Sequence, residues 1–227
     1  QGFTESDAQF DKLLLVEALF QTFIVEFRIG FDVQGRITRL VFRPTRSTDG
    51  FRVPEYADAD SFTESAVVVG EGGKWPLPGT LTLPLGSGPF PVVVLAGDSG
   101  PADRDGTVGL TKPFRDLAWG LASQGIAVLR YESRTRQYSG IERSASFTLA
   151  DEMVDDVLAA LELLERIGRL DHVRVFVLGH GLGGYSIPRI ATLTQDVAGY
   201  IVLAGGARPI PDLIVERLEY VAGLDGE

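Results

Sequence analysis

Glycines crowd the end of the apolar run VFVLGHGLGG, which spans residues 175–184. Two signatures with chemical meaning fit this run. Gly179, Gly181 and Gly184 fit G-x-G-x-x-G, the turn that cradles the phosphates of a dinucleotide. Gly179, Gly181 and Gly183 fit G-x-S-x-G, the nucleophile elbow of serine hydrolases, with glycine at the position of the reactive serine. The first signature predicts a bound cofactor, and the second predicts a hydrolase scaffold without its nucleophile.

The surroundings of the turn favour the second interpretation. A dinucleotide site needs an early strand–helix–strand unit and a carboxylate at the end of the next strand, but several apolar runs precede this turn. The next run ends in Leu203-Ala204-Gly205-Gly206 without a carboxylate. A nucleophile elbow needs a sharp strand-to-helix turn with glycines two positions before and after the nucleophile, and Gly179 and Gly183 occupy those positions. A glycine-rich turn with a purely structural role is the third interpretation.

Composition narrows the chemistry further. The 227 residues carry a formal charge of −10, which opposes nucleic acid binding because that affinity comes mainly from lysine and arginine. There is no cysteine, and the two histidines, His172 and His180, lack the spacing of a zinc site. We therefore expect no metal, no cofactor and no nucleic acid partner. No apolar run approaches the roughly 20 residues that span a membrane, so we expect a soluble protein, either cytoplasmic or secreted after removal of a leader, with no membrane partner.

The N-terminal part of the sequence differs in pattern from the rest. Residues 6–20 have the apolar spacing of a helix, and residues 23–31 and 37–42 are rich in the β-branched and aromatic residues of a hairpin. We therefore assign residues 1–44 to a small α+β segment. Residues 45–63 are charged, contain proline and lack periodicity, which predicts a linker.

Residues 64–227 alternate apolar runs with helical patterns. Strands are expected at residues 67–69, 80–83, 92–96, 126–131, 173–178 and 200–204. Helices are expected at residues 112–123, 149–167, 183–194 and 212–221. This alternation predicts an α/β domain, in which helices cover both faces of a mostly parallel sheet.

Several long segments resemble the bacterial serine esterase-like branch of the α/β-hydrolase superfamily. GHGLGG is similar to the GHSLGG elbow of that branch. The other similar segments are LPGTLTLP at residues 77–84, AGDSGPADRDG at 96–106, and residues 116–136 and 198–214. Residues 31–44 resemble the end of a small α+β domain that often precedes such hydrolases. The resemblance implies an α/β-hydrolase fold and carboxylic-ester hydrolysis as the parent reaction.

The resemblance also implies roles for residues in the turn. A serine in the elbow attacks the ester, a histidine takes its proton, and an acid orients the histidine. Gly181 stands at the position of that serine, and the elbow residues around it are Gly179, His180 and Gly183. In the family, the acid and then the histidine follow the nucleophile on strands that come after the one expected here at residues 200–204. This sequence offers no candidate for either residue there, so we expect the chain to be inactive as it stands.

The oxyanion hole of the family is built from backbone N–H groups. The resemblance implies that Leu182 supplies one donor, and that Asp98 or Ser99 supplies the other. This loop differs from the family because Asp98 is inserted before Ser99. A carboxylate at this place opposes the charge that the hole would stabilise. The charged residues 103–105 of the same loop are expected to tie it down rather than to face a substrate.

Three histories account for such a chain: a serine-to-glycine variant of an active esterase, a naturally inactive relative, or a fragment. The alternative function is a non-catalytic module that binds a small ester or carboxylate without turning it over. In the family, two more strands follow the one expected at residues 200–204, so the fold would lack its C-terminal strands. Because YIVLAGG has no charge or proline to protect a sheet edge, we expect self-association or additional polypeptide at this strand.

Overall fold

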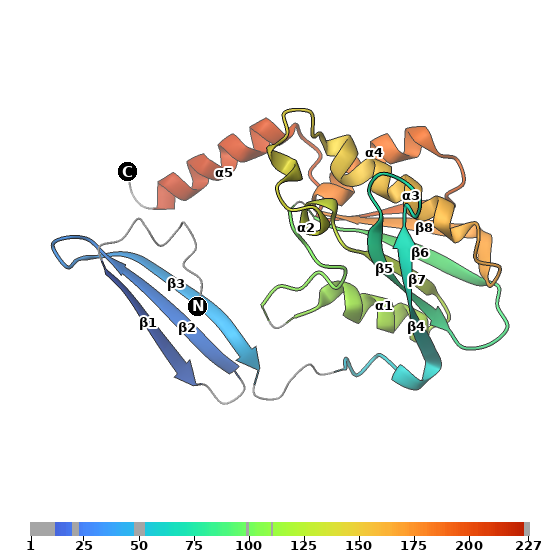
Figure 1. Cartoon of the computed structure of the whole chain (residues 1–227), viewed down its shortest axis with the longest axis horizontal. Helices are drawn as coiled ribbons and strands as arrows, with labels where there is room; N and C mark the ends of the chain where they lie inside the picture. Colours follow the sequence, from blue (N-terminus) through green and yellow to red (C-terminus); the bar gives the residue numbers. More distant parts are fainter. Residues whose placement is uncertain (1–11, 20–22, 48–52, 99, 110, 225–227) are drawn as a thin grey trace. The chain divides into compact units, whose positions relative to one another are not determined.

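The computed structural model describes residues 12–19, 23–47, 53–98, 100–109 and 111–224 (Figure 1). The chain divides into two compact units, residues 1–53 with 107–112 and residues 54–106 with 113–227. The first unit contains a three-stranded antiparallel sheet, and the second contains a six-stranded mixed sheet with helices.

The sheet of the first unit has the order β1–β2–β3, with strands β1 (Lys12–Leu19), β2 (Phe23–Phe31) and β3 (Ile37–Ser47). The predicted hairpin is confirmed as β2 and β3. Asp32 organises its turn, because Asp32 Oδ1 accepts hydrogen bonds of 2.9 Å from the backbone N–H groups of Gln34 and Arg36.

The helix expected over residues 6–20 is wrong for residues 12–19, which form β1; the rest of that segment lies outside the described residues. β1 pairs antiparallel with β2 along its whole length. The run Leu13-Leu14-Leu15-Val16 is continuously apolar, so it fits a strand as well as a helix, and pairing with a neighbouring strand decides between them. The described part of residues 1–44 is therefore all antiparallel sheet.

Part of the expected linker, residues 45–63, also has regular structure. β3 continues to Ser47, a short 3-10 helix η2 spans Ala59–Ser61, and the next strand begins at Phe62. The boundary between the two units falls after Val53, within the segment that the sequence assigned to the linker.

The second unit is built on a mixed sheet in the order β4–β5–β7–β6–β8–β9. Its strands are β4 (Phe62–Val69), β5 (Leu77–Pro84), β6 (Phe90–Ala96), β7 (Ala127–Tyr131), β8 (Leu170–His180) and β9 (Gly199–Leu203). β4, β5 and β7 pair antiparallel, whereas β7, β6, β8 and β9 pair parallel. The predicted mostly parallel sheet is confirmed, and β8 lies inside it between β6 and β9.

Helices cover both faces of this sheet (Figure 1). They are α1 (Pro113–Ser123), α2 (Arg134–Gln137), α3 (Asp155–Leu164), α4 (Leu182–Leu193) and α5 (Ile210–Leu224), with a short 3-10 helix η3 (Ile141–Arg143) and a π-helix η4 (Ala150–Val154). Alternate residues of β6 face opposite sides. Val93 and Leu95 pack in a cluster with Ala118 of α1, whereas Val92 and Val94 pack in a cluster with residues of α3 and α4. The predicted α/β class is thereby confirmed.

Among the described residues, no helix has both the length and the apolar character needed to cross a bilayer.

Candidate active-site turn and adjoining cavity

Gly181 forms the turn between β8 and α4, with φ of 57° and ψ of −117°. A residue with a side chain is strained at such a positive φ, and this strain is typical of the nucleophile position in an elbow. The turn is held on both sides. The Gly181 N–H donates to the Leu203 carbonyl, and the Tyr185 N–H donates to the Gly181 carbonyl, both at 3.0 Å. The sharp strand-to-helix turn that the sequence predicts is therefore present.

Close backbone contacts require glycine on either side of residue 181. A Cβ on Gly179 would lie 2.5 Å from the carbonyl carbon and oxygen of Gly183. A Cβ on Gly183 would lie 2.5 Å from the carbonyl oxygens of Ala96 and Gly97. The Gly183 N–H also donates to the Gly97 carbonyl at 3.0 Å. The turn after β8 is thus joined tightly to the loop after β6.

The carboxylate of Asp98 occupies the space over Gly181. Asp98 Oδ1 accepts a 2.9 Å hydrogen bond from the Leu182 N–H. A Cβ on Gly181 would come within 2.5 Å of both carboxylate oxygens. Leu182 is the first residue of α4, where unpaired N–H groups and the helix dipole favour negative charge. Asp98 therefore fills the space beside Gly181 and binds the first N–H of α4.

The other described candidate residues near the turn have structural contacts or lie away from it. Ser99, the other candidate for the second oxyanion donor, lies outside the described residues. The His180 ring packs edge-on against Phe114, with centroids 6.2 Å apart. His172 is exposed near the beginning of β8, whereas the turn is at the end of that strand. Ser186 is buried, and its Oγ donates to the Leu182 carbonyl at 2.9 Å, so it is a packed helix residue.

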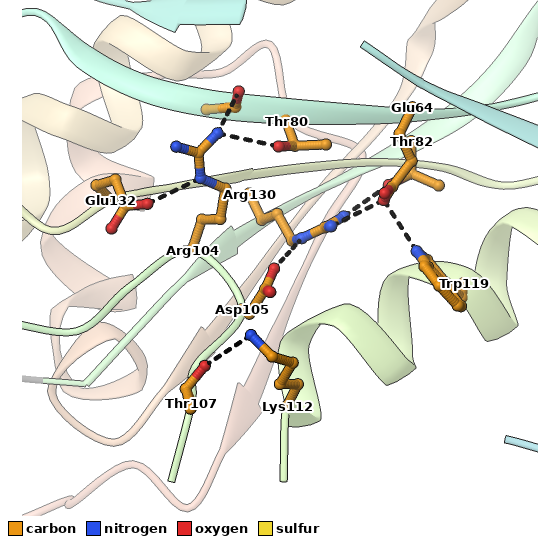
Figure 2. A network of polar contacts seen from close by, with 11 residues as sticks. Glu64, Thr80, Thr82, Arg104, Asp105, Thr107, Lys112, Trp119, Arg130 and Glu132 are labelled. Atoms are coloured by element: carbon orange, nitrogen blue, oxygen red, sulfur yellow. Dashed lines mark hydrogen bonds and ion pairs between the residues drawn. The ribbon is translucent and has the colours of Figure 1, made fainter. Parts of the chain in front are cut away.

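A buried arginine anchors the loop after β6 to the sheet (Figure 2). Arg130 of β7 is only 2% exposed, and Figure 2 shows its guanidinium between Asp105 on one side and Glu64 and Thr82 on the other. It donates to Asp105 Oδ1 at 3.2 Å, Glu64 Oε1 at 2.8 Å and Thr82 Oγ1 at 2.7 Å. The loop of residues 97–106 is therefore anchored to the sheet through Asp105.

Arg104 supplies a second anchor for the same loop (Figure 2). Its Nε donates to Glu132 Oε1 at 2.8 Å, and its Nη1 donates to the Gly79 carbonyl at 2.9 Å and to Thr80 Oγ1 at 3.1 Å. The prediction that this charged cluster ties down its own loop is confirmed for Arg104 and Asp105. Both side chains bind the sheet, so they serve to position the backbone that carries Asp98.

A cavity of about 470 Å³ adjoins the turn. This volume is within the range of small-molecule sites, about 300–1,000 Å³. Leu182, whose N–H donates to Asp98, forms part of the wall of this cavity. The apolar part of the wall also includes Pro101, Phe147, Leu149 and Ile210.

The same cavity contains a buried carboxyl group that the sequence analysis did not single out. Glu152 of η4 is 7% exposed and lines the cavity, and its Oε1 accepts a 2.8 Å hydrogen bond from Thr135 Oγ1. Burial raises the pKa of Glu152, against the lowering effects of the Thr135 hydrogen bond and of the Arg134 charge. The signal in the sequence was an acid on the helical stripe that continues through Asp156 and Ala160, positions that are buried here.

Asp156 and Arg134 form a buried ion pair behind Glu152. Their side chains are 4% and 5% exposed, and the Arg134 Nη2 and Nε atoms both donate to Asp156 Oδ1. Burial raises the pKa of Asp156 to about 7 despite the charge of Arg134. Among the described residues, no group of three or more histidine, aspartate and glutamate side chains is arranged to hold a metal ion.

The chain is 36% identical over 226 residues to esterase EstD of Thermotoga maritima, and the match covers 96% of this chain and 52% of EstD. The chain thus spans about half the length of this curated relative. No family model matches the sequence.

Many solved structures share the fold, and two of them illustrate the likeness. One is the α/β hydrolase GrgF from Penicillium sp. sh18, with a TM-score of 0.52 and 19% identity over 73% of this chain and 56% of GrgF. The other is brefeldin A esterase, described as a bacterial homologue of human hormone sensitive lipase, with a TM-score of 0.50 and 18% identity over 69% of this chain and 43% of that protein. At these identities the likeness concerns the fold alone.

Proposed function

We propose that the chain is a member of the α/β-hydrolase superfamily that carries the ester-binding scaffold of a carboxylesterase, with the acyl-enzyme route closed at residue 181. Its 36% identity to an esterase and the fold it shares with an α/β hydrolase support this proposal. Gly181 is the observation that carries this proposal. In the parent reaction a serine Oγ attacks the ester carbonyl, forms an acyl-enzyme and releases the alcohol. Glycine has no atom that could form this bond, and the turn geometry supports residue 181 as the position concerned.

Asp98 favours a second candidate function, a non-catalytic module that binds a small ester or carboxylate. The Leu182 N–H already holds a carboxylate, that of Asp98, at 2.9 Å. A carboxylate is therefore a group to which this N–H can donate a hydrogen bond. The cavity beside Leu182 offers space for the rest of a small ligand. In this function Asp98 would compete with the ligand for the amide.

Residues 1–227 are expected to show no covalent labelling by a fluorophosphonate probe and no ester turnover. Gly181→Ser is expected to give no turnover by itself, because the His180 ring packs on Phe114 and Asp98 stands where the new Cβ must go. Intact-mass spectrometry after labelling and a nitrophenyl-ester assay measure both results.

Gly181→Ala is the matched control for that experiment, since it adds the same Cβ without a hydroxyl. Stoichiometric labelling of any serine in the unaltered chain would sink the proposal. Esterase turnover in Gly181→Ser alone would show that residues 1–227 already contain a working acid and base.

We further propose that the outer edge of β9 pairs with a strand from outside residues 1–227 or from a second copy of the chain. β9 is the last strand in the sheet order, and no strand among the described residues pairs with its outer edge. Its side chains Ile201, Val202 and Leu203 are 44%, 53% and 48% exposed. Apolar residues beside unpaired backbone groups favour pairing with another strand.

Isolated residues 1–227 are therefore expected to self-associate at micromolar concentrations in sedimentation velocity experiments. Ile201→Lys is expected to shift the chain toward monomer, because a charge on an edge strand opposes pairing. Val173→Lys, at a position 82% exposed on β8, controls for the added charge. A stable monomer with strongly protected β9 amides would overturn this proposal.

A further inference from the structure

The cavity beside the turn is lined by acids and by apolar residues. Among the lining residues that the structure describes, Glu142 and Glu152 carry negative charge, and none is a lysine, an arginine or a histidine. Phe147, Leu149 and Ile210 belong to the apolar part of the wall. An apolar wall lowers the effective dielectric constant and so strengthens the field of the two carboxylates. The cavity is therefore negative as well as apolar.

The two acids differ in how far a ligand can approach them. The Glu152 carboxyl group is buried and already accepts hydrogen bonds from the Thr135 hydroxyl, at 2.8 Å, and from the backbone N–H of Gly100. It is a fixed charge of the wall. Glu142 lies in the 3-10 helix η3 and is exposed, and its Oε2 accepts a 3.0 Å hydrogen bond from the Gly140 N–H. Glu142 is thus the carboxylate that a ligand would meet on entering.

The negative charges act on each other across the cavity. Burial is the main cause of the raised pKa of Glu152, and the charge of Glu142 raises this pKa further. The charge of Arg134 lowers it. However, Arg134 is bound to Asp156, and its Nη1 atom lies 3.9 Å from Asp151 Oδ1, so two acids compensate this arginine. A negative group that entered the cavity would meet the repulsion that Glu152 already experiences.

We propose that the cavity accepts the acyl chain of an ester when that chain is neutral or positively charged, that it rejects a chain ending in a carboxylate, and that Glu142 sets this preference. The inference rests on the proposed function and deepens it, because it names the class of ester that the scaffold takes. Desolvation in an apolar cavity disfavours a cation and an anion alike. The field of Glu142 and Glu152 disfavours the anion alone, so the sign of the charge separates the two effects.

Three methyl esters with the same acyl chain length test the proposal: dimethyl adipate, monomethyl adipate and methyl 6-ammoniohexanoate. They are titrated into residues 1–227 at pH 7 and low ionic strength and followed by amide NMR shifts at residues 147–149. The ammonium ester is expected to bind about tenfold more tightly than the carboxylate ester. Sodium chloride at about 0.5 M is expected to reduce this ratio to about threefold, because Glu142 is exposed to screening.

Glu142→Gln is expected to reduce the same ratio to about threefold, by weakening the binding of the ammonium ester and strengthening that of the carboxylate ester. The glutamine keeps an oxygen that can accept the hydrogen bond from the Gly140 N–H. A general loosening of the cavity would instead weaken the binding of all three esters. Glu165→Gln is the matched control, because it removes the same charge at an exposed position that does not line this cavity.

Equal affinities of the ammonium and carboxylate esters for the unaltered chain would overturn the inference. An equal change of the ratio in Glu142→Gln and Glu165→Gln would overturn it as well. Neither result would count against the proposed function, provided that dimethyl adipate still bound.

Asp98→Ala tests the proposed function separately. This substitution removes the carboxylate from the Leu182 N–H, and dimethyl adipate is then expected to shift the Leu182 amide. Failure of that shift would count against the proposed ester site alone, because selection by charge at residues 147–149 would still support the inference. Absence of binding by all three esters would overturn both proposals.

Discussion

Replacing Arg130 by methionine is expected to lower the free energy of unfolding at pH 7 by about 3 kcal/mol. The Arg130 side chain is 3% exposed and compensates the charges of Glu64 and Asp105. Methionine fills much of the same volume but leaves both carboxylates without their cation. We expect the lower end of the cost for breaking a buried ion pair, because Glu64 and Asp105 are 32% and 18% exposed and keep some hydration. Urea unfolding followed by circular dichroism measures the change.

The loss is also expected to depend on pH. Burial acts to raise the pKa of Glu64, but the hydrogen bond and charge of Arg130 outweigh it, with smaller contributions from Trp119 and Thr82, so the pKa is lowered. A lowered pKa gives stability that is present above the ordinary value of 4.5 and is lost as pH falls through the folded-state pKa. Acid therefore removes stability from the unaltered chain, and the difference between it and Arg130→Met should shrink below about pH 4.

Arg136→Met provides the control. The Arg136 side chain is 50% exposed and pairs with Glu132 at 2.9 Å. Glu132 is 13% exposed but keeps its 2.8 Å ion pair with Arg104 when Arg136 is lost, so the loss should cost less than about 1 kcal/mol. If Arg130→Met were as mild as Arg136→Met at pH 7, the Arg130 network would contribute no more than this half-exposed arginine. The anchoring of the loop that carries Asp98 would then need another cause.

Sequence patterns predicted the large sheet well because its signals are local. β8 and α4 illustrate this, since an apolar run followed by closely spaced glycines has few structural solutions other than a strand, a turn and a helix. The strand at residues 12–19 was missed because the continuously apolar run Leu13-Leu14-Leu15-Val16 has the periodicity of neither a strand nor a helix. The strand forms because this segment pairs with β2. Such pairing is a property of two segments together and has no signature in either segment alone.

The candidate site was predictable to a similar degree. The turn at Gly181 follows from local glycine spacing, and the inserted Asp98 was singled out in the loop beside it. That the Asp98 carboxylate accepts a hydrogen bond from Leu182 depends on the path of the loop after β6, which no local pattern encodes. The cavity was missed for the same reason, because its wall combines residues from Gly100 to Ile210. Glu152 alone carried a signal, as an acid on a buried helical stripe.

The contact between the turn and the loop after β6 makes Gly183→Ala the most sensitive small substitution in the site. The new Cβ would lie 2.5 Å from the carbonyl oxygens of Ala96 and Gly97, and these are backbone atoms that cannot rotate away. The backbone must move, which would break the 3.0 Å hydrogen bond from the Gly183 N–H to the Gly97 carbonyl. The resulting shift would also carry Asp98, the next residue in the loop, away from the Leu182 N–H.

We expect Gly183→Ala to lower the free energy of unfolding by about 3 kcal/mol, the upper end of overpacking costs, even though alanine is favoured over glycine in a helix by about 1 kcal/mol. Gly168→Ala is the matched control, because a Cβ on Gly168 would meet no atom within 4 Å. Urea unfolding of both variants measures the difference, and the Leu182 amide shift reports whether Asp98 has moved. If the two alanine variants were equally stable and the Leu182 amide shift were unchanged, the inference that the turn and the loop are in tight contact would be wrong. The position of Asp98 over Gly181 depends on that contact, so the explanation of the closed site would then fail with it.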